Sequence, residues 1–315
     1  MKTKIFRATT ATAMKTTASA KAAATVQASV KTTAAATVVA LLAGCNFFEP
    51  IYDTPHPDHG RVTLTTDWSE RGEDVEIPDA WHVRVNGDDA TRQTFARASV
   101  ELPDLFAPET HRLHLWHDAP GITMSGNVAS VEAVILNRAA PRTVSADPGW
   151  FFSDAVGIEI EKDKVHELTV TMHQQVRRLT LVVEPTGDAA ERVESISATL
   201  SGVAGTLDID THHHGSPSHV ALDFTKGTDG KWTATMKLLG IAGAEQKLTG
   251  TIVFEDGTPL SIALESDLST ALVDFNADKK TPLTLGGTTA ETPNGVDITA
   301  TITDWNEVTE QIDIN

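Results

Sequence analysis

The stretch RVTLTTDW, residues 61–68, alternates apolar and polar side chains over most of its length. In an extended chain Val62, Leu64 and Trp68 lie on one face, and polar side chains lie on the other. The outward positions are mostly threonine, which suits a pleated surface that is half exposed. The stretch therefore predicts a β-strand that buries one face.

The same alternation recurs along the rest of the chain. Glycine, proline, asparagine and aspartate separate the alternating segments, as expected for turns. We predict an all-β fold of short antiparallel strands packed into β-sandwiches. The alternating segments are 80–87, 111–117, 166–173, 177–185, 219–226, 231–240, 247–257, 259–266 and 295–305.

One segment has a helical spacing instead. In SDLSTALVDFNADKK, residues 266–280, the apolar residues Leu268, Leu272 and Phe275 are four and three positions apart. Ser266 or Asp267 could cap such a helix. We predict one helix there.

The first 44 residues differ from the rest in charge and composition. They carry six lysines and arginines and no acid, and an apolar run occupies residues 34–43. This pattern predicts a secretory signal peptide, and ten apolar residues are fewer than the about 20 that span a bilayer. Translation can start at Met1 or at Met14, and the sequence leaves this open.

The single cysteine, Cys45, follows that apolar run directly. Leu42, Ala43, Gly44 and Cys45 form a lipobox, in which small residues admit a signal peptidase and the thiol takes a diacylglycerol. Several acyl chains, such as palmitate, anchor a protein stably, whereas one chain binds weakly. We therefore predict lipidation at Cys45, followed by a lipid-anchored tether over 45–60. Asn46 favours the outer membrane, with the body exposed at the cell surface.

Charge and size limit what the body after the signal can do. Residues 45–315 carry 19 basic and 43 acidic residues, a formal net charge of −24. Such a surface repels phosphates, so we expect no nucleic-acid partner. A lone cysteine excludes a disulfide framework. The length is near the limit for one core, so we predict an N-terminal domain over 61–175 and a C-terminal domain over 176–315.

Catalytic motifs are scarce in the sequence, which has no G-x-S-x-G, no H-E-x-x-H and no phosphate-binding glycine loop. DIDTHHHGSPSH, residues 208–219, places His212, His213 and His214 in succession, but consecutive side chains of a strand or turn point in different directions. This segment predicts a solvated hairpin loop, and the alternative that the sequence leaves open is a site for zinc or another divalent ion. His111, His114 and His117 cannot converge either, because His114 faces away from the other two in a strand. We expect no catalytic residue, no cofactor and no enzymatic activity.

Tryptophans supply an alternative function. Trp116 falls on the polar face of its strand, and Trp150 lies in a PGWFF segment near a loop. Exposed indole rings could bind a glycan, so the alternative is a surface lipoprotein that captures glycans as nutrients. Trp68, Trp81 and Trp232 fall on apolar faces and are predicted to lie in the core.

Several segments together resemble a known family. They are LAGC at 42–45, the tether PIYDTPHPDHG, RVTLTTDWS at 61–69, VRRLTLVVEPTG with ISATLSGV downstream, and the ending ITATITDW. Over most of residues 40–308 they resemble the fimbrial anchor-subunit lipoproteins of Bacteroidales, within the fimbrillin (type V pilus) superfamily. The resemblance implies two tandem transthyretin-like domains and a non-enzymatic protein that anchors or caps a fimbria. It leaves open a base, tip or accessory position and any host ligand.

The resemblance also implies a mechanism of partner binding. In polymerising fimbrillins an arginine-specific protease removes the first strand, and a strand of another shaft or accessory subunit takes its place by β-strand addition. Anchor members keep that strand. Here Arg71, in SERGED after the first strand, is the candidate protease-sensitive site, and we expect it to stay uncut. The tail 306–315 could be an exchanged strand, although a solvated terminus is favoured.

Overall fold

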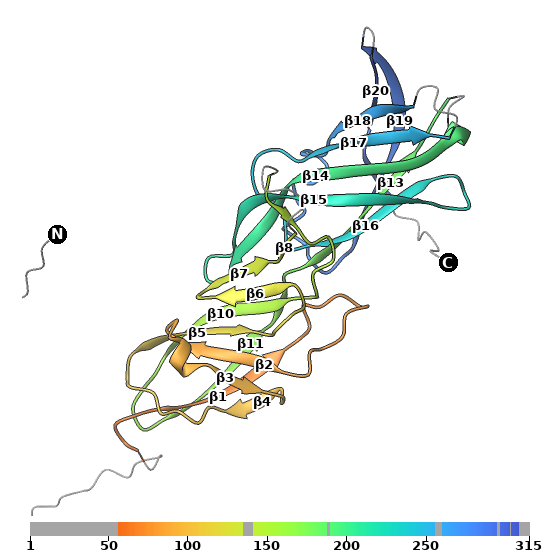
Figure 1. The fold of residues 1–315 in the computed structure, drawn as a ribbon. Helices are drawn as coiled ribbons and strands as arrows, with labels where there is room; N and C mark the ends of the chain where they lie inside the picture. Colours follow the sequence, from red (N-terminus) through yellow and green to blue (C-terminus); the bar gives the residue numbers. More distant parts are fainter. Residues whose placement is uncertain are drawn as a thin grey trace, which may run out of the picture. The chain divides into compact units, whose positions relative to one another are not determined.

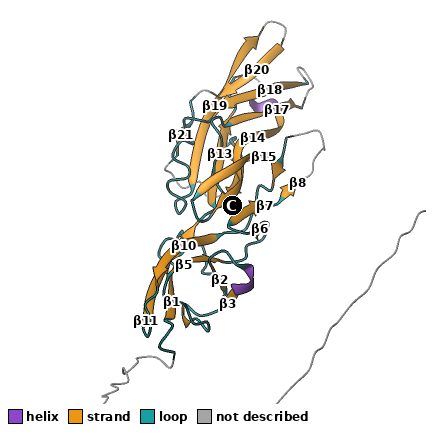
Figure 2. Ribbon diagram, turned by 90° about the vertical axis from the view of Figure 1, so that its left-hand side faces the viewer, coloured by secondary structure: helices purple, strands orange, loops and turns teal. Residues whose placement is uncertain are grey.

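The computed structural model describes residues 56–134, 141–187, 190–255, 260–294, 297–302 and 304–308. Within these ranges the chain forms strands, with only two single turns of 3-10 helix, η1 (Asp89–Thr91) and η2 (Ala190–Arg192) (Figure 2). The all-β prediction is therefore confirmed. The predicted signal peptide, Cys45 and most of the tether lie outside the described residues.

Strand β1 (Arg61–Asp67) lies between two other strands of a three-stranded sheet, β11 (Val165–Thr171) and β4 (Ser99–Glu101) (Figure 1). It pairs in parallel with all seven residues of β11 and antiparallel with β4. Val62 and Leu64 have no exposed surface, and Thr63 and Thr65 are half-exposed. The predicted alternation is confirmed, and both neighbours depend on β1 for backbone partners.

A five-stranded sheet covers the buried face of β1. Its order is β12 (His173–Gln174), β10 (Phe152–Glu159), β5 (Thr110–Trp116), β2 (Trp81–Val85) and β3 (Gln93–Phe95). The two sheets share one hydrophobic core, to which β1 contributes Val62 and Leu64. Its other large members include Trp81, Phe106, Leu113, Leu115, Phe152 and Met172.

The later strands close on themselves in the described residues. Eight strands follow one another by pairing: β14 (Val193–Asp208), β17 (Lys247–Phe254), β18 (Ser261–Asp267), β20 (Asp297–Ile302), β19 (Leu283–Asn294), β13 (Arg177–Glu184), β16 (Trp232–Leu238) and β15 (His213–Lys226). Strand β15 pairs back to β14 and completes the circuit. Strand β21 (Asn306–Glu307) adds to β19. A second core lies inside, and the transthyretin-like description of the fold stays a prediction.

Four short strands between β5 and β10 pair with this circuit. They are β6 (Ile122–Ser125), β7 (Val128–Val131), β8 (Ala133–Val134) and β9 (Thr143–Val144). Strand β7 pairs with β14, and β9 pairs with β15. Their side chains Ala129, Val131 and Val144 belong to the second core. The domain boundary at 175/176 stays a prediction. Strands β7 and β9, which precede it in sequence, pair with β14 and β15, which follow it.

The helix predicted over 266–280 is wrong. Strand β18 continues through Asp267, and residues 269–277 form consecutive turns. Leu268, Leu272 and Phe275 are buried as the spacing suggested. Because so short a segment gains few helical hydrogen bonds against the cost of nucleation, packing of these three side chains decides its conformation.

We expect Leu64→Ala to lower the free energy of unfolding by about 2–5 kcal/mol, because truncation leaves a cavity in the first core. Thr63→Ala, on the opposite face of β1, should change it by less than about 0.5 kcal/mol. Urea denaturation of the body without its signal peptide measures both. Equal effects of the two substitutions would contradict the assignment of the buried face.

Candidate functional site

The loop after β1 carries the predicted protease-sensitive residue, Arg71. Its side chain is half-exposed and folds back on its own loop, where Nη1 donates to the carbonyl oxygens of Val75, at 2.9 Å, and Gly72, at 3.4 Å. Val75 N in turn donates to Gly72 O at 3.2 Å. The guanidinium is thus bonded to the turn that follows it.

The next residue, Gly72, is buried and bonded to a distant glutamine. Gly72 N donates to Oε1 of Gln174 at 2.8 Å, and Nε2 of Gln174 donates to Val176 O at 2.9 Å and Lys279 O at 2.7 Å. We call these three bonds the Gln174 clamp. Any Cβ at Gly72 would lie 3.0 Å from Lys280 O, so the position fits glycine closely.

Two ion pairs flank the clamp. Glu70 pairs with Lys280 at 2.9 Å, and Asp74 pairs with Arg178 at 2.6 Å. All four side chains are partly exposed, so solvent screens each pair and its contribution is small. They bring the loop after β1 against the loop at 278–281 and against the start of β13.

Lys279 lies beside the clamp with its ammonium group buried. Nζ bonds to Gln175 O at 3.1 Å, Leu239 O at 2.5 Å and Nε2 of His214 at 3.1 Å. Burial, with a smaller effect of Arg177, lowers the pKa of Lys279 to about 7. Burial and the nearby Lys279 lower the pKa of His214 to about 3, so its imidazole is neutral and accepts this bond.

The clamp forms part of the wall of a pocket of about 620 Å³. Basic and acidic side chains both line it, from the loop after β1, from β12, from the turn between β14 and β15, and from the loop at 278–281. The lining residues include Glu70, His173, His212, His214, Asp278 and Lys280.

The histidine cluster at 212–214 is solvated only in part. His212 and His213 are exposed, and His212 has a φ of 56° at the turn between β14 and β15. His214 instead points inward to Lys279, which the local sequence did not indicate. Within the described ranges, no group of three or more His, Cys, Asp or Glu side chains could hold a metal ion.

The polar face of β5 is covered instead of solvated. Trp116 is only 1% exposed, and the guanidinium carbons of Arg84 and Arg92 lie 5.4 and 5.3 Å from its ring centroid. Arg84 also donates to Gly126 O and to Asn127 Oδ1, in the turn between β6 and β7. Alternation placed Trp116 on the polar face correctly, but the expectation of an exposed ring is wrong.

His114 on the same face is also buried. It lies 3.5 Å from Asp210, which Arg112 contacts at 2.6 Å. Desolvation lowers the pKa of His114 and outweighs the opposing effect of Asp210. His111 bonds to Ala107 O, and His117 accepts from Phe152 N, so the three histidines have separate partners.

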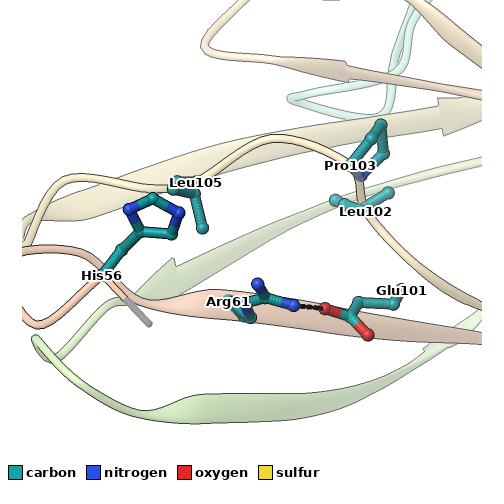
Figure 3. Close-up of a pocket in the computed structure, with 6 residues that line it drawn as sticks. All are labelled: His56, Arg61, Glu101, Leu102, Pro103 and Leu105. Carbon is teal, nitrogen blue, oxygen red and sulfur yellow. Dashed lines mark hydrogen bonds and ion pairs between the residues drawn. The ribbon is translucent and has the colours of Figure 1, made fainter. Parts of the chain in front are cut away.

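A smaller pocket of about 330 Å³ lies where the chain enters β1. Figure 3 shows the ion pair between Arg61 and Glu101 beside His56. Leu102, Pro103 and Leu105 complete its lining. The described part of the chain contains no helix with the length and apolar character needed to cross a membrane.

Comparisons with known proteins place the chain among fimbrial proteins. A family model for fimbrillin-A associated anchor proteins Mfa1 and Mfa2 matches residues 135–311. The fold is similar to the fimbrial anchor protein Mfa2 from Porphyromonas gingivalis, with a TM-score of 0.53 and 11% identity over 79% of this chain and 97% of that chain. A candidate adhesin from Bacteroides ovatus gives a TM-score of 0.54 and 15% identity over 76% and 91% of the two chains.

A candidate polysaccharide-binding protein from Bacteroides thetaiotaomicron is similar as well, with a TM-score of 0.53 and 10% identity over 76% of this chain and 95% of that chain. At these identities the structural similarity shows the fold alone. A search of curated proteins found no match.

Lys279 predicts a pH dependence of stability. Its pKa is 10.5 in the unfolded chain and about 7 in the folded one, so between these values the unfolded state holds more protons. The contribution of Lys279 to stability therefore rises with pH through this window, and the cost of burying its charge is fully present below pH 7.

From pH 7 to 9, the free energy of unfolding of the wild type should rise by roughly 2–3 kcal/mol relative to that of Lys279→Met, as measured by urea denaturation. Lys280→Met, which removes a partly exposed amine, is the matched control. Its free energy of unfolding should vary with pH as that of the wild type does. Parallel slopes for wild type and Lys279→Met would contradict the buried position of the amine.

Proposed function

The chain belongs to the family of fimbrillin-A associated anchor proteins, and we propose that it anchors or caps a fimbria as a non-enzymatic lipoprotein of the outer membrane. The carrying observation is the position of β1 in the middle of its sheet. In sequence β1 follows the tether from Cys45 directly. A lipid on Cys45 would therefore be joined to the folded body through a strand that pairs on both sides.

This arrangement suits a protein that bears load. A pull on the tether acts at the start of β1, and pairing with β11 continues over its seven residues. Val62 and Leu64, fully buried below the strand, add the cost of exposing apolar surface to any extraction of β1. The body would thus stay attached to the lipid for as long as the chain between them is intact.

Retention of β1 also requires that the loop after it is not cut. Cleavage between Arg71 and Gly72 would separate Cys45 and β1 from the rest of the body. The Gln174 clamp and the bonds of Arg71 hold this peptide bond within a folded loop. We propose that the anchored form keeps the bond intact.

Fimbrial shaft or accessory subunits are the proposed partners, joined by β-strand pairing. In the described part of the chain, β11 and β4 end the sheet that contains β1, and a sheet edge offers unpaired backbone groups to an incoming strand. The alternative of glycan capture has less support. Trp116 is buried, and Trp150 is half-buried with Arg178 and Lys237 over its ring.

Cys45→Ala should abolish incorporation of a palmitate analogue and release fimbriae from the cells into the medium, because the lipid anchor is lost. Metabolic labelling and immunoblots of the cell and medium fractions measure these effects. Cells producing Thr63→Ala, with the lipobox intact, should retain their fimbriae. Fimbriae that stay on cells producing unlabelled Cys45→Ala would exclude anchoring through this residue.

The mature protein on cells should contain Cys45 and Gly72 in one polypeptide, because the loop at Arg71 stays folded. Intact mass and amino-terminal sequencing of protein extracted from the cell surface test this expectation. A surface form that begins at Gly72 would instead assign the chain to the polymerising subunits.

A further inference from the structure

We propose that Gln174 is the residue that protects the Arg71–Gly72 peptide bond from arginine-directed proteolysis, and so decides whether β1 stays part of the molecule. This proposal rests on the proposed function, in which β1 must stay attached to the body. It adds a named side chain, more than 100 positions away in sequence, that controls the bond.

A protease can cut a loop only after drawing it into an extended form, with its backbone groups free and the arginine side chain inserted in a specificity pocket. The folded loop opposes each requirement. The Arg71 guanidinium donates to Val75 O at 2.9 Å, and Gly72 N donates to Gln174 Oε1 at 2.8 Å. Cleavage must therefore wait for a local opening of the loop.

Gln174 is a buried side chain whose hydrogen bond to Gly72 this opening must break. Its side chain is buried, and a primary amide offers both an acceptor and two donors. Oε1 accepts from Gly72 in the loop after β1, while Nε2 donates to Val176 O, between β12 and β13, and to Lys279 O, in the loop at 278–281. Withdrawing Gly72 would leave Oε1 buried without a partner, which is unfavourable.

Hydrogen bonds of Lys279 and Arg177 also fix the position of the clamp. Nζ of Lys279 bonds to the backbone oxygen of Gln175, the residue next to the clamp, at 3.1 Å. Arg177 donates to Thr281 O at 2.6 Å and to Phe275 O at 3.1 Å. Residues 174–177 are therefore fixed to the segment 275–281, and the side-chain amide of Gln174 is preorganised to hold Gly72.

Loss of the clamp would convert the chain into a form whose first strand can be removed. Cleavage after Arg71 would free a fragment that contains β1, and its departure would uncover β11, β4 and the first core below Val62 and Leu64. That is a groove one strand wide, of the kind that a strand from another subunit fills.

The test compares Gln174→Leu with Gln175→Leu. Gln175 is the matched control, because it is the adjacent buried glutamine and its Nε2 donates to Ser153 O, away from Gly72. The purified body without its signal peptide is treated with an arginine-specific endoproteinase, and mass spectrometry follows the fragment that begins at Gly72. Urea denaturation of the same samples measures the global stability of each variant.

We expect this fragment to appear at least tenfold faster from Gln174→Leu than from wild type, and within about twofold of wild type from Gln175→Leu. Unchanged resistance of Gln174→Leu would overturn the proposal. So would equal cleavage of the two variants, which would reflect general loosening, and so would rapid cleavage of the wild type.

Hydrogen exchange supplies a second readout, and its measurement on the wild type does not depend on a folded variant. The amide of Gly72 donates to the side chain of Gln174, so its exchange should be slow in the wild type and at least tenfold faster in Gln174→Leu. An amide that exchanges in the wild type as fast as in an unstructured peptide would overturn the clamp.

The clamp and the anchoring function fail in different experiments. Selective cleavage of Gln174→Leu together with fimbriae that stay on cells after Cys45→Ala would support the clamp and contradict anchoring. Resistance of Gln174→Leu together with shedding after Cys45→Ala would support anchoring and contradict the clamp.

Discussion

The pairing of β1 on both sides is the constraint on which the first half of the structure depends. Strand β11 pairs with β1 in parallel, although more than 90 residues separate them, and β4 pairs with its other edge. Val62 and Leu64 pack from the inner face of this sheet into the first core. Removing β1 would expose backbone groups on two strands and the apolar surface below them, so the molecule needs the strand, or a substitute for it, to remain folded.

Buried polar groups tie the segments around β1 to the later strands. Gln174 of β12, Arg177 at the start of β13 and Lys279 in the loop at 278–281 direct their hydrogen bonds mostly to backbone carbonyls. A buried ammonium group costs stability at neutral pH, and breaking such contacts one at a time leaves unsatisfied partners. These buried polar contacts therefore favour one defined arrangement of residues 174–177, and their net gain in stability is small. Such an arrangement is what the proposed protection of the Arg71–Gly72 bond requires.

The same principle accounts for the covered face of β5. Arg112 of β5 bonds to Asp210, just after β14, and Arg84 of the neighbouring strand β2 bonds to Asn127 in the turn between β6 and β7. Strands β6 to β9 lie between β5 and β10 in sequence. Of these, β7 pairs with β14 and β9 pairs with β15. A face that the sequence pattern marks as polar is thus buried by polar contacts.

The sequence by itself predicted ten of the strands and their inward side chains, because alternation depends on neighbouring residues, but it did not indicate β10, β14 or β19. It also carries the lipobox motif at Cys45, whose lipidation stays a prediction. The helical spacing correctly predicted that Leu268, Leu272 and Phe275 are buried, although the backbone there forms turns and not a helix. Tertiary structure alone decided that Trp116 is covered, that His214 contacts Lys279, and that Gln174 holds Gly72 from 102 positions away. Such partners are fixed by how strands pack and close, and a polar residue carries no local mark of the segment that it will meet.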